Sequence, residues 1–105
     1  MCSDVVVIRG GGDIGTGVAL RLFNSGYEVV ITEIENPRVI RREVAFATAV
    51  YKGSMTLEGV RGVKAGTLDE VSNLLKDRTI PVVVDSDCSA VAALNPRVVV
   101  DAQLA

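Results

Sequence analysis

The sequence predicts an α/β fold: a Rossmann-like, doubly wound, mostly parallel sheet of about five strands with helices on both faces. Continuous Val- and Ile-rich runs, beginning with 4–9, are typical of strands buried on both faces of a parallel sheet. These runs alternate with segments of helical spacing, and glycines separate them. The chain of 105 residues, 49% hydrophobic and 23% charged, suits a single domain that covers residues 1–105.

The first elements form a βαβ unit. After the strand over 4–9 and the glycines at 10–12, apolar residues at Ile14, Val18 and Leu22 predict a helix. Gly26 stands where a glycine ends a helix, and 28–33 is a second apolar strand. The two strands are therefore expected to be parallel and joined by a right-handed crossover.

The rest of the chain continues the alternation. Asn36 and Pro37 are a cap and first-turn pair for a second helix, and Thr67 with Glu70 forms a capping box for a third. The other expected elements are a hairpin from 55–57 to 60–65, strands over 81–85 and 98–101, and a short helix around 89–94.

Composition excludes several function classes. There is no His, which excludes His-dependent nucleophilic catalysis and His-ligated zinc within this chain, and two Cys are too few for a disulfide scaffold. The net charge of −2 and 4% aromatic content are unfavourable for nucleic acid, which is not expected as a partner.

No membrane association is expected either, because the apolar runs are far shorter than the roughly 20 residues that span a bilayer. The first residues, 1–4, lack the basic segment of a signal peptide, so the expected location is the cytoplasm. The apolar composition favours a surface covered by a partner, as in a homodimer or a contact with a second domain.

The glycine-rich turn carries the main functional prediction. Its spacing fits G-x-G-x-x-G between a strand and a helix, as in dinucleotide-binding folds. Such glycines permit a tight turn, approach of a phosphate and close helix packing, while the helix start attracts an anion. The predicted cofactor-binding residues here are Gly10, Gly11, Gly12, Asp13, Ile14 and Gly15. The alternative is a glycine turn that serves packing alone.

Two acids modify this prediction. Glu33 ends the second strand 18 positions after Gly15, close to the position of an acid that binds a ribose hydroxyl, which favours an NAD-type nucleotide. Asp13 is expected to cap the same amides that a phosphate would use, and its charge opposes that phosphate. Arg9 either offsets this charge or pairs with Asp13.

Other candidates lie outside this turn. Arg41 and Arg42, with Arg38, form either a phosphate-binding cluster or a solvated helix face. The segment 85–88 either holds Mg²⁺ or, as favoured here, caps the following helix, and Cys88 is expected to be a structural thiol. No metal site is predicted, and the sequence offers no complete catalytic set.

Two segments carry a family resemblance. Residues 5–19, with Arg-Gly-Gly-Gly-Asp-Ile-Gly-Thr, and residues 40–51, with Ile-Arg-Arg-Glu-Val-Ala-Phe, resemble the YqeB family. The resemblance implies an accessory protein of selenium-dependent molybdenum hydroxylases, similar to the Rossmann portion of xanthine dehydrogenase maturation factors. It also implies proteins of that system as partners and a molybdopterin-type cofactor. Family members are longer, so this chain is expected to be an N-terminal fragment or a short paralogue. They also carry a proline-containing turn where this chain has 85–88, so the resemblance lends no role to Cys88.

The glycine turn predicts binding of a nucleotide, NAD-type favoured. The resemblance implies that the chain is a maturation protein and that the bound cofactor is alternatively of the molybdopterin type. One alternative is the NAD-binding domain of an oxidoreductase whose catalytic half lies elsewhere. Another is a non-catalytic module in which nucleotide occupancy controls assembly.

Overall fold

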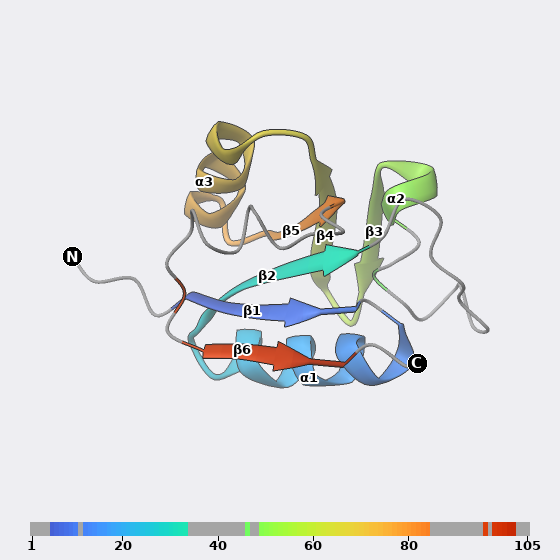
Figure 1. The fold of residues 1–105 in the computed structure, drawn as a ribbon, viewed down its shortest axis with the longest axis vertical. Coiled ribbons are helices and arrows are strands. Elements are labelled where there is room, and N and C mark those ends of the chain that lie inside the picture. Colours follow the sequence, from blue (N-terminus) through green and yellow to red (C-terminus); the bar gives the residue numbers. More distant parts are fainter. Residues whose placement is uncertain are drawn as a thin grey trace.

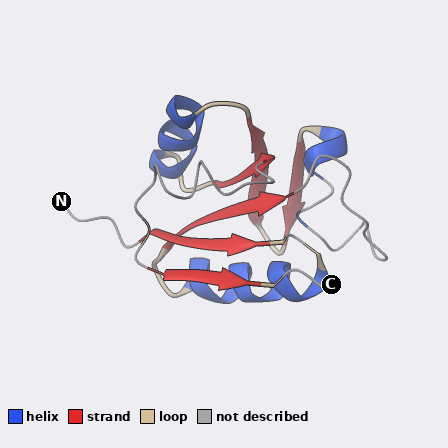
Figure 2. Cartoon of the chain, in the orientation of Figure 1, coloured by secondary structure: helices blue, strands red, loops and turns tan. Residues whose placement is uncertain are grey.

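The computed structural model of the chain describes residues 5–10, 12–33, 46, 49–84, 96 and 98–102. Within these residues the protein is a mixed α/β structure built on one six-stranded sheet (Figures 1 and 2). The strands are β1 (Val5–Arg9), β2 (Glu28–Glu33), β3 (Ser54–Leu57), β4 (Val60–Ala65), β5 (Ile80–Val84) and β6 (Val98–Asp101). The described helices are α1 (Asp13–Asn24), α2 (Ala49–Lys52) and α3 (Leu68–Lys76).

The sheet has the strand order β3-β4-β5-β2-β1-β6. Every neighbouring pair is parallel except β3 and β4, which form an antiparallel hairpin. The predicted mostly parallel sheet is therefore confirmed. It has one strand more than expected because the first arm of the hairpin joins the sheet as an edge strand.

Helices cover both faces of the sheet. Along β1, Val6 and Ile8 pack in the cluster that contains Phe23 of α1, whereas Val5 and Val7 pack with Val71 of α3. This alternation follows from the two-residue period of a strand. Figure 1 accordingly shows α1 and α3 on opposite sides of the sheet.

Helix α1 ends as the sequence predicts. Gly26 has a φ of 102°, and its N–H donates to the carbonyl of Phe23 at 3.1 Å. The N–H of Tyr27 donates to the carbonyl of Leu22 at 3.2 Å. These two bonds form a Schellman motif, which satisfies carbonyls that the last helical turn leaves without a partner.

The hairpin turn between β3 and β4 consists of two residues with positive φ. Glu58 has a φ of 50° and Gly59 a φ of 80°, the pattern of a type I′ turn. The twist of this turn matches that of the flanking strands, which pair from Leu57 opposite Val60 to Ser54 opposite Val63. The predicted hairpin is confirmed.

Helix α3 has its predicted cap at one end and an unexpected one at the other. The hydroxyl of Thr67 accepts from the N–H of Glu70 at 3.2 Å and donates to its carboxylate at 3.4 Å. At the C-terminus, Arg78 takes the left-handed position with a φ of 56°, where glycine is usual. Its guanidinium donates to the carbonyl of Phe23 at 3.3 Å and lies 4.2 Å from the centre of the Phe23 ring.

Two of the expected helices cannot be compared in full. The helix expected from Asn36 lies outside the described residues except for Phe46 and the residues of α2, and the helix expected around 89–94 lies entirely outside them. In the part of the chain that is described, no helix has the length and apolar character needed to cross a membrane.

Candidate functional site

The glycine-rich turn connects β1 with α1 at the carboxyl ends of the central strands. Gly10 follows β1 with a φ of 103°, a conformation that side chains disfavour. Its N–H donates to the carbonyl of Thr32 in β2 at 2.8 Å. Gly10 therefore bends the chain out of the sheet while its amide still bonds to the neighbouring strand.

Gly15 is the position where the helix approaches the turn most closely. A Cβ atom added to Gly15 would overlap the carbonyl oxygen of Gly10 and would lie 3.5 Å from the Cβ of Ala102. Only a residue without a side chain fits here. This is the packing role expected of the third glycine in the motif.

Gly12 has the opposite surroundings. Among the described residues, no atom lies within 4 Å of the position that a Cβ on Gly12 would take. Its φ of −76° and ψ of −162° are open to any residue. Space beside the backbone at the second glycine is what close approach of a ligand would require.

The first turn of α1 begins at this open position. Gly12 is the N-cap, and its carbonyl accepts the N–H of Thr16 at 2.8 Å. The amides of residues 13–15 precede that bond and have no acceptor within the helix. Ile14 is 59% exposed, so the helix start faces solvent.

The N-cap position of α1 is taken by Gly12 and not, as the sequence suggested, by Asp13, whose side chain lies outside what the structure describes. Asp13 is the first helical residue, and the N-cap is Gly12, which brings no side chain to the first-turn amides. The reason is that the glycine takes the extended backbone conformation of an N-cap one residue earlier.

Glu33 lies at the end of β2 but is not an open acid. It is 7% exposed and makes a polar or electrostatic contact within the chain. Glu33 is the register partner of Val84 in β5. The residue before it, Thr32, is the register partner of Arg9 in β1. Glu33 therefore shares the carboxyl edge of the sheet with the glycine turn, as the sequence predicts for parallel strands.

Arg9 links β1 to β6. Its Nη1 lies 3.3 Å from a carboxylate oxygen of Asp101, and the two side chains are 30% and 59% exposed. Asp101 is the register partner of Arg9 in the sheet. This ion pair was not anticipated from the sequence, because only the strand order brings residues 92 apart together.

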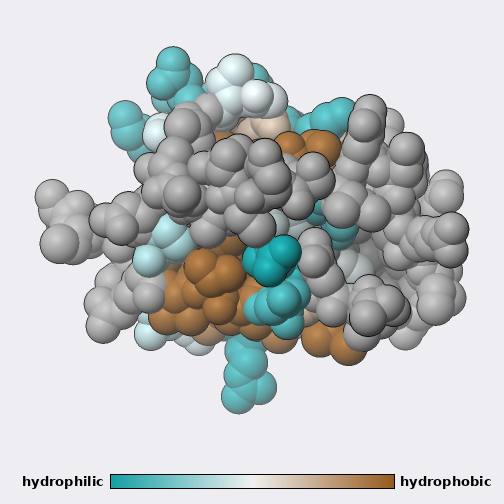
Figure 3. All heavy atoms as spheres, in the orientation of Figure 1, coloured by the Kyte–Doolittle hydropathy of each residue, from teal (hydrophilic) through white to brown (hydrophobic). Residues whose placement is uncertain are grey.

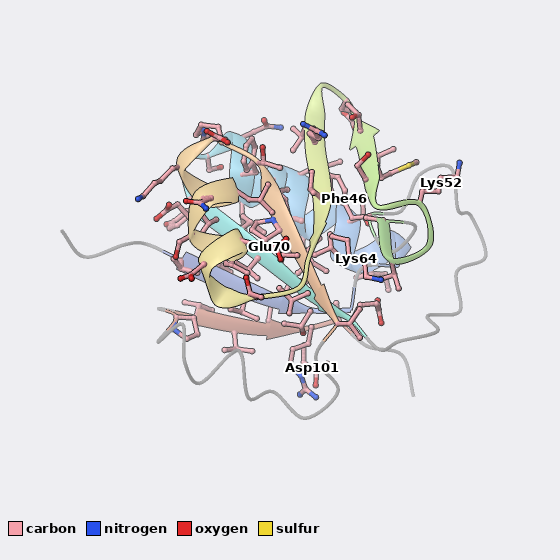
Figure 4. The ribbon with its side chains drawn as sticks, turned by 90° about the horizontal axis from the view of Figure 1, so that it is seen from above. Phe46, Lys52, Lys64, Glu70 and Asp101 are labelled. Carbon is pink, nitrogen blue, oxygen red and sulfur yellow. The ribbon has the colours of Figure 1, made fainter. Side chains whose placement is uncertain are left out.

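Thr16 connects the two segments that carry the family resemblance. Its hydroxyl, buried in the first turns of α1, accepts the N–H of Phe46 at 2.9 Å. Phe46 is fully buried, and a Cβ on Gly62 of β4 would lie 2.6 Å from its ring (Figure 4). The sequence analysis did not identify Thr16 as a residue that joins the two segments. The one indication in the sequence is its position directly after the glycine motif.

Thr32 is a second polar residue that the sequence pattern concealed. It is 1% exposed, and within the described residues its hydroxyl has no hydrogen-bond partner. A Thr inside a run of Val and Ile reads as an ordinary strand residue. Thr32 directly precedes Glu33, the last residue of β2, so it lies near the same edge of the sheet as Glu33.

Several predicted site residues lie outside the described residues: Gly11, Arg41, Arg42 and the segment 85–88 with Cys88. Within the residues that are described, no group of three or more Cys, Asp or Glu side chains is placed to hold a metal ion.

Comparison with known proteins gives one informative match. The chain is 52% identical over 101 residues, 96% of its length, to the uncharacterized protein YqeB of Escherichia coli strain K12. The chain spans about a fifth (19%) of the length of this relative. No protein-family profile matches the sequence, and no solved structure matches it. The match to YqeB supports the resemblance seen in the two sequence segments, and the chain is similar to one part of a YqeB-type protein.

Proposed function

We propose that this chain binds the phosphate of a nucleotide, NAD-type favoured, or of a molybdopterin-type cofactor at the turn from Gly10 to Gly15. The observation that carries the proposal is the different surroundings of the three glycines. Gly10 makes the turn with positive φ, Gly12 has open space beside it, and Gly15 packs against a carbonyl. A turn kept for packing alone would need the first and third glycines but not the second.

The main-chain amides of residues 13–15 are the groups proposed to bind the anion. They stand at the positive end of a helix of 12 residues, where the helix dipole adds to hydrogen bonding. The exposure of Ile14 gives a ligand access to this helix end. Main-chain amides contact only the phosphate of a ligand. The helix start therefore selects for a phosphate group and does not distinguish one nucleotide base from another.

We further propose that the sheet is the Rossmann-like, doubly wound type. The order β5-β2-β1-β6 supports this, because the chain runs from β1 to one side and returns to the other side with β6. In open α/β sheets, ligands bind outside the carboxyl ends of the strands where this reversal occurs. The reversal lies between β1 and β6, directly beside Gly10.

Two charged groups bear on the identity of the ligand. Glu33, at the end of β2, is proposed to accept a hydrogen bond from a ribose hydroxyl. To do so, its carboxylate must exchange its present contact within the chain for the ligand.

Arg42 lies four residues before Phe46, so chain length keeps its Cα within about 14 Å of the Phe46 Cα. Since Phe46 bonds to Thr16, the pair Arg41 and Arg42 is proposed to supply positive charge to a second phosphate.

The biological role proposed from the resemblance is accessory. By its similarity to a YqeB-type protein, the chain is proposed to act in the cytoplasm in maturation of a molybdenum hydroxylase, with proteins of that system as partners. The selenium dependence of such systems belongs to the same proposal.

Thermal unfolding with candidate ligands tests the binding site. A ligand at one hundred times its dissociation constant stabilises the native state by about 2.7 kcal/mol, which raises the melting temperature by roughly 10 °C or more. NAD, NADP, ATP, CTP and molybdopterin nucleotides are compared under the same conditions. No shift with any of them at large excess would contradict the proposal.

A matched pair of glycine variants separates the site from the scaffold. Gly12→Val places a side chain in the open space at the helix start, whereas Gly17→Val adds the same side chain farther along α1, where a Cβ also meets nothing. The proposal expects Gly12→Val to abolish the ligand-dependent shift and Gly17→Val to keep it. Equal shifts in both variants would place the ligand elsewhere.

A further inference from the structure

The carboxyl end of β2 holds two adjacent buried polar side chains. Thr32 is 1% exposed and Glu33 is 7% exposed. In the described part of the chain, Thr16 and Thr79 are the other polar residues buried to this degree. Burial of a polar side chain costs free energy unless the side chain has hydrogen-bond partners. Two such residues at one strand end, beside the glycine turn, therefore point to a role beyond packing.

The three buried threonines differ in what their hydroxyls bond. Thr16 accepts a main-chain N–H at 2.9 Å, and Thr79 donates to a main-chain carbonyl at 3.4 Å. The hydroxyl of Thr32 has no hydrogen-bond partner among the described residues. The main chain of Thr32 is bonded, because its carbonyl accepts the N–H of Gly10 at 2.8 Å. The Thr32 hydroxyl is thus a buried donor and acceptor that the described fold does not use.

The direction of the Thr32 side chain follows from the alternation along β2. Ile31 packs in the cluster that contains Phe23 of α1, whereas Val30 packs in the cluster that contains residues of α3. Successive strand residues point to opposite faces, so Thr32 points to the α3 face and Glu33 to the α1 face. The two buried polar side chains therefore flank the end of β2 from both faces.

The register of the sheet gives Thr32 one apolar and one charged neighbour. Val83 of β5 is its partner on one side, and Arg9 of β1 is its partner on the other. Val83 belongs to the apolar cluster of α3, whereas Arg9 pairs with Asp101 of β6. Figure 3 shows hydrophilic residues beside the apolar surface where β6 lies. Because Asp101 balances the charge of Arg9, a group that bonds to Thr32 is best neutral, with an apolar face for Val83 and a polar edge for the hydroxyl.

We propose that the hydroxyl of Thr32 binds the base of the nucleotide, an inference that rests on the proposed binding of its phosphate at the glycine turn. A nucleotide base is neutral, with an apolar aromatic face and hydrogen-bonding atoms along its edge. In adenine, which an NAD-type nucleotide carries, and in cytosine, a ring nitrogen that accepts lies beside an amino group that donates. One hydroxyl can bond to both. The base is joined to the ribose assigned to Glu33, so the adjacent residue of the strand lies within its reach.

This assignment divides recognition of the ligand between two elements. The amides of residues 13–15 bind a phosphate whatever base is attached, whereas Thr32 contacts the base. Because Thr32 is 1% exposed, a base reaches its hydroxyl only when covering side chains move aside. Arg9 is a described neighbour that can move, since its side chain is long and 30% exposed. The ligand-free protein therefore bears the cost of an unpartnered hydroxyl, and the bound nucleotide removes it.

Two valine substitutions test whether the Thr32 hydroxyl lacks a partner in the ligand-free chain. Thr32→Val keeps the shape of the side chain and removes the hydroxyl, so it is expected to raise the melting temperature by roughly 4 °C or more. Thr79→Val is the matched control and is expected to lower the melting temperature, because the hydroxyl of Thr79 has an acceptor. A Thr32→Val chain that melts no higher than the wild type would overturn the proposal.

Titration with AMP and ribose 5-phosphate tests the contact with the base. The two ligands differ in the base alone, which a hydroxyl replaces in ribose 5-phosphate. Thr32→Val is expected to weaken AMP binding about three- to tenfold, as for the loss of one hydrogen bond, and to leave ribose 5-phosphate binding unchanged. Thr32→Ser keeps the hydroxyl and is expected to bind AMP nearly as tightly as the wild type.

CMP is the second nucleotide in this titration. A loss confined to AMP assigns the contact to adenine, and an equal loss for CMP assigns it to the amino edge that the two bases share. Unchanged binding of AMP and CMP by Thr32→Val would overturn the inference and leave the phosphate site in place. A wild-type chain that binds neither nucleotide nor ribose 5-phosphate would instead contradict the proposed function, and the assignment of Thr32 would fall with it.

Discussion

The main-chain N–H of Phe46 donates to the hydroxyl of Thr16 at 2.9 Å, across thirty residues of sequence. This bond fixes Phe46 against the first turns of α1. Thr16→Val keeps the shape of the side chain but leaves a buried N–H without its acceptor, which costs about 1–3 kcal/mol of unfolding free energy. Thr16→Ser retains the hydroxyl and is expected to lose clearly less. Denaturant unfolding measures both, and equal losses would show that the hydroxyl is not what matters.

The overlap between a side chain at Gly15 and the Gly10 carbonyl predicts a large effect for a small change. Gly15→Ala must push α1 away from the end of β1, at an overpacking cost of about 1–3 kcal/mol. Gly17→Ala on the same helix meets nothing and is expected to stabilise by about 1 kcal/mol through helix propensity. Melting temperatures that move in the same direction for both variants would refute this account of Gly15.

The contact between Gly62 and the Phe46 ring predicts a compensating pair of substitutions. A Cβ at Gly62 would lie 2.6 Å from the ring, so Gly62→Ala is expected to destabilise by about 1–3 kcal/mol. Phe46→Leu alone leaves a partial cavity and also destabilises. Because the smaller side chain makes room for the added methyl, the double variant is expected to be more stable than the sum of the single losses predicts. A double-mutant cycle in urea measures this coupling, and strict additivity would exclude the contact.

Arg78 combines an unfavourable backbone conformation with two favourable side-chain contacts. Arg78→Ala keeps the positive φ and removes both the stacking on Phe23 and the bond to its carbonyl, for a loss of about 1–2 kcal/mol. Arg78→Gly removes the same contacts but relieves the backbone, which recovers about 1 kcal/mol. The expected order of stability is therefore Arg, Gly, Ala. Arg61→Ala, at an exposed position of β4, is the control and should change little.

The hairpin turn offers a stabilising substitution. Glu58 has a φ of 50° at the first central position of a type I′ turn, where Asn is preferred before glycine. Glu58→Asn is expected to raise the unfolding free energy by about 0.5–1 kcal/mol, because Asn tolerates the left-handed conformation better. Glu58→Ala provides the comparison, since it removes the carboxylate without that tolerance. A gain with Ala equal to the gain with Asn would point to the lost charge instead.

Local elements were predictable from the sequence because each has a local cause. The strands over 5–9 and 28–33 follow from uninterrupted apolar residues, and α3 follows from the Thr67 cap and its amphipathic spacing. The end of α1 shortly before Gly26 follows from the need for a residue that accepts positive φ after the helix. In each case a few neighbouring residues determine the backbone, so pattern reasoning finds the element.

Relations between distant residues were not predictable in the same way. Nothing near Arg9 in the sequence indicates Asp101, and nothing near Thr16 indicates Phe46, because both contacts depend on the order of strands in the sheet. The position of the α1 cap also escaped prediction, since an acid and a glycine competed for it and the glycine's backbone conformation decided the outcome. Of the glycine turn, the bend at Gly10 and the close packing at Gly15 were predictable. The burial of Glu33 was not.

The place of β6 beside β1 has a consequence for how the protein is made. Among the described strands, β1 is synthesised first although it lies inside the sheet, and its neighbour β6 follows some 92 residues later, as the Arg9–Asp101 pair records. Until β6 has been synthesised, the main-chain groups on one side of β1 have no strand of this sheet to pair with. Completion of this sheet thus depends on a long-range pairing of β6 with β1, and pairings of that sequence separation form slowly during folding.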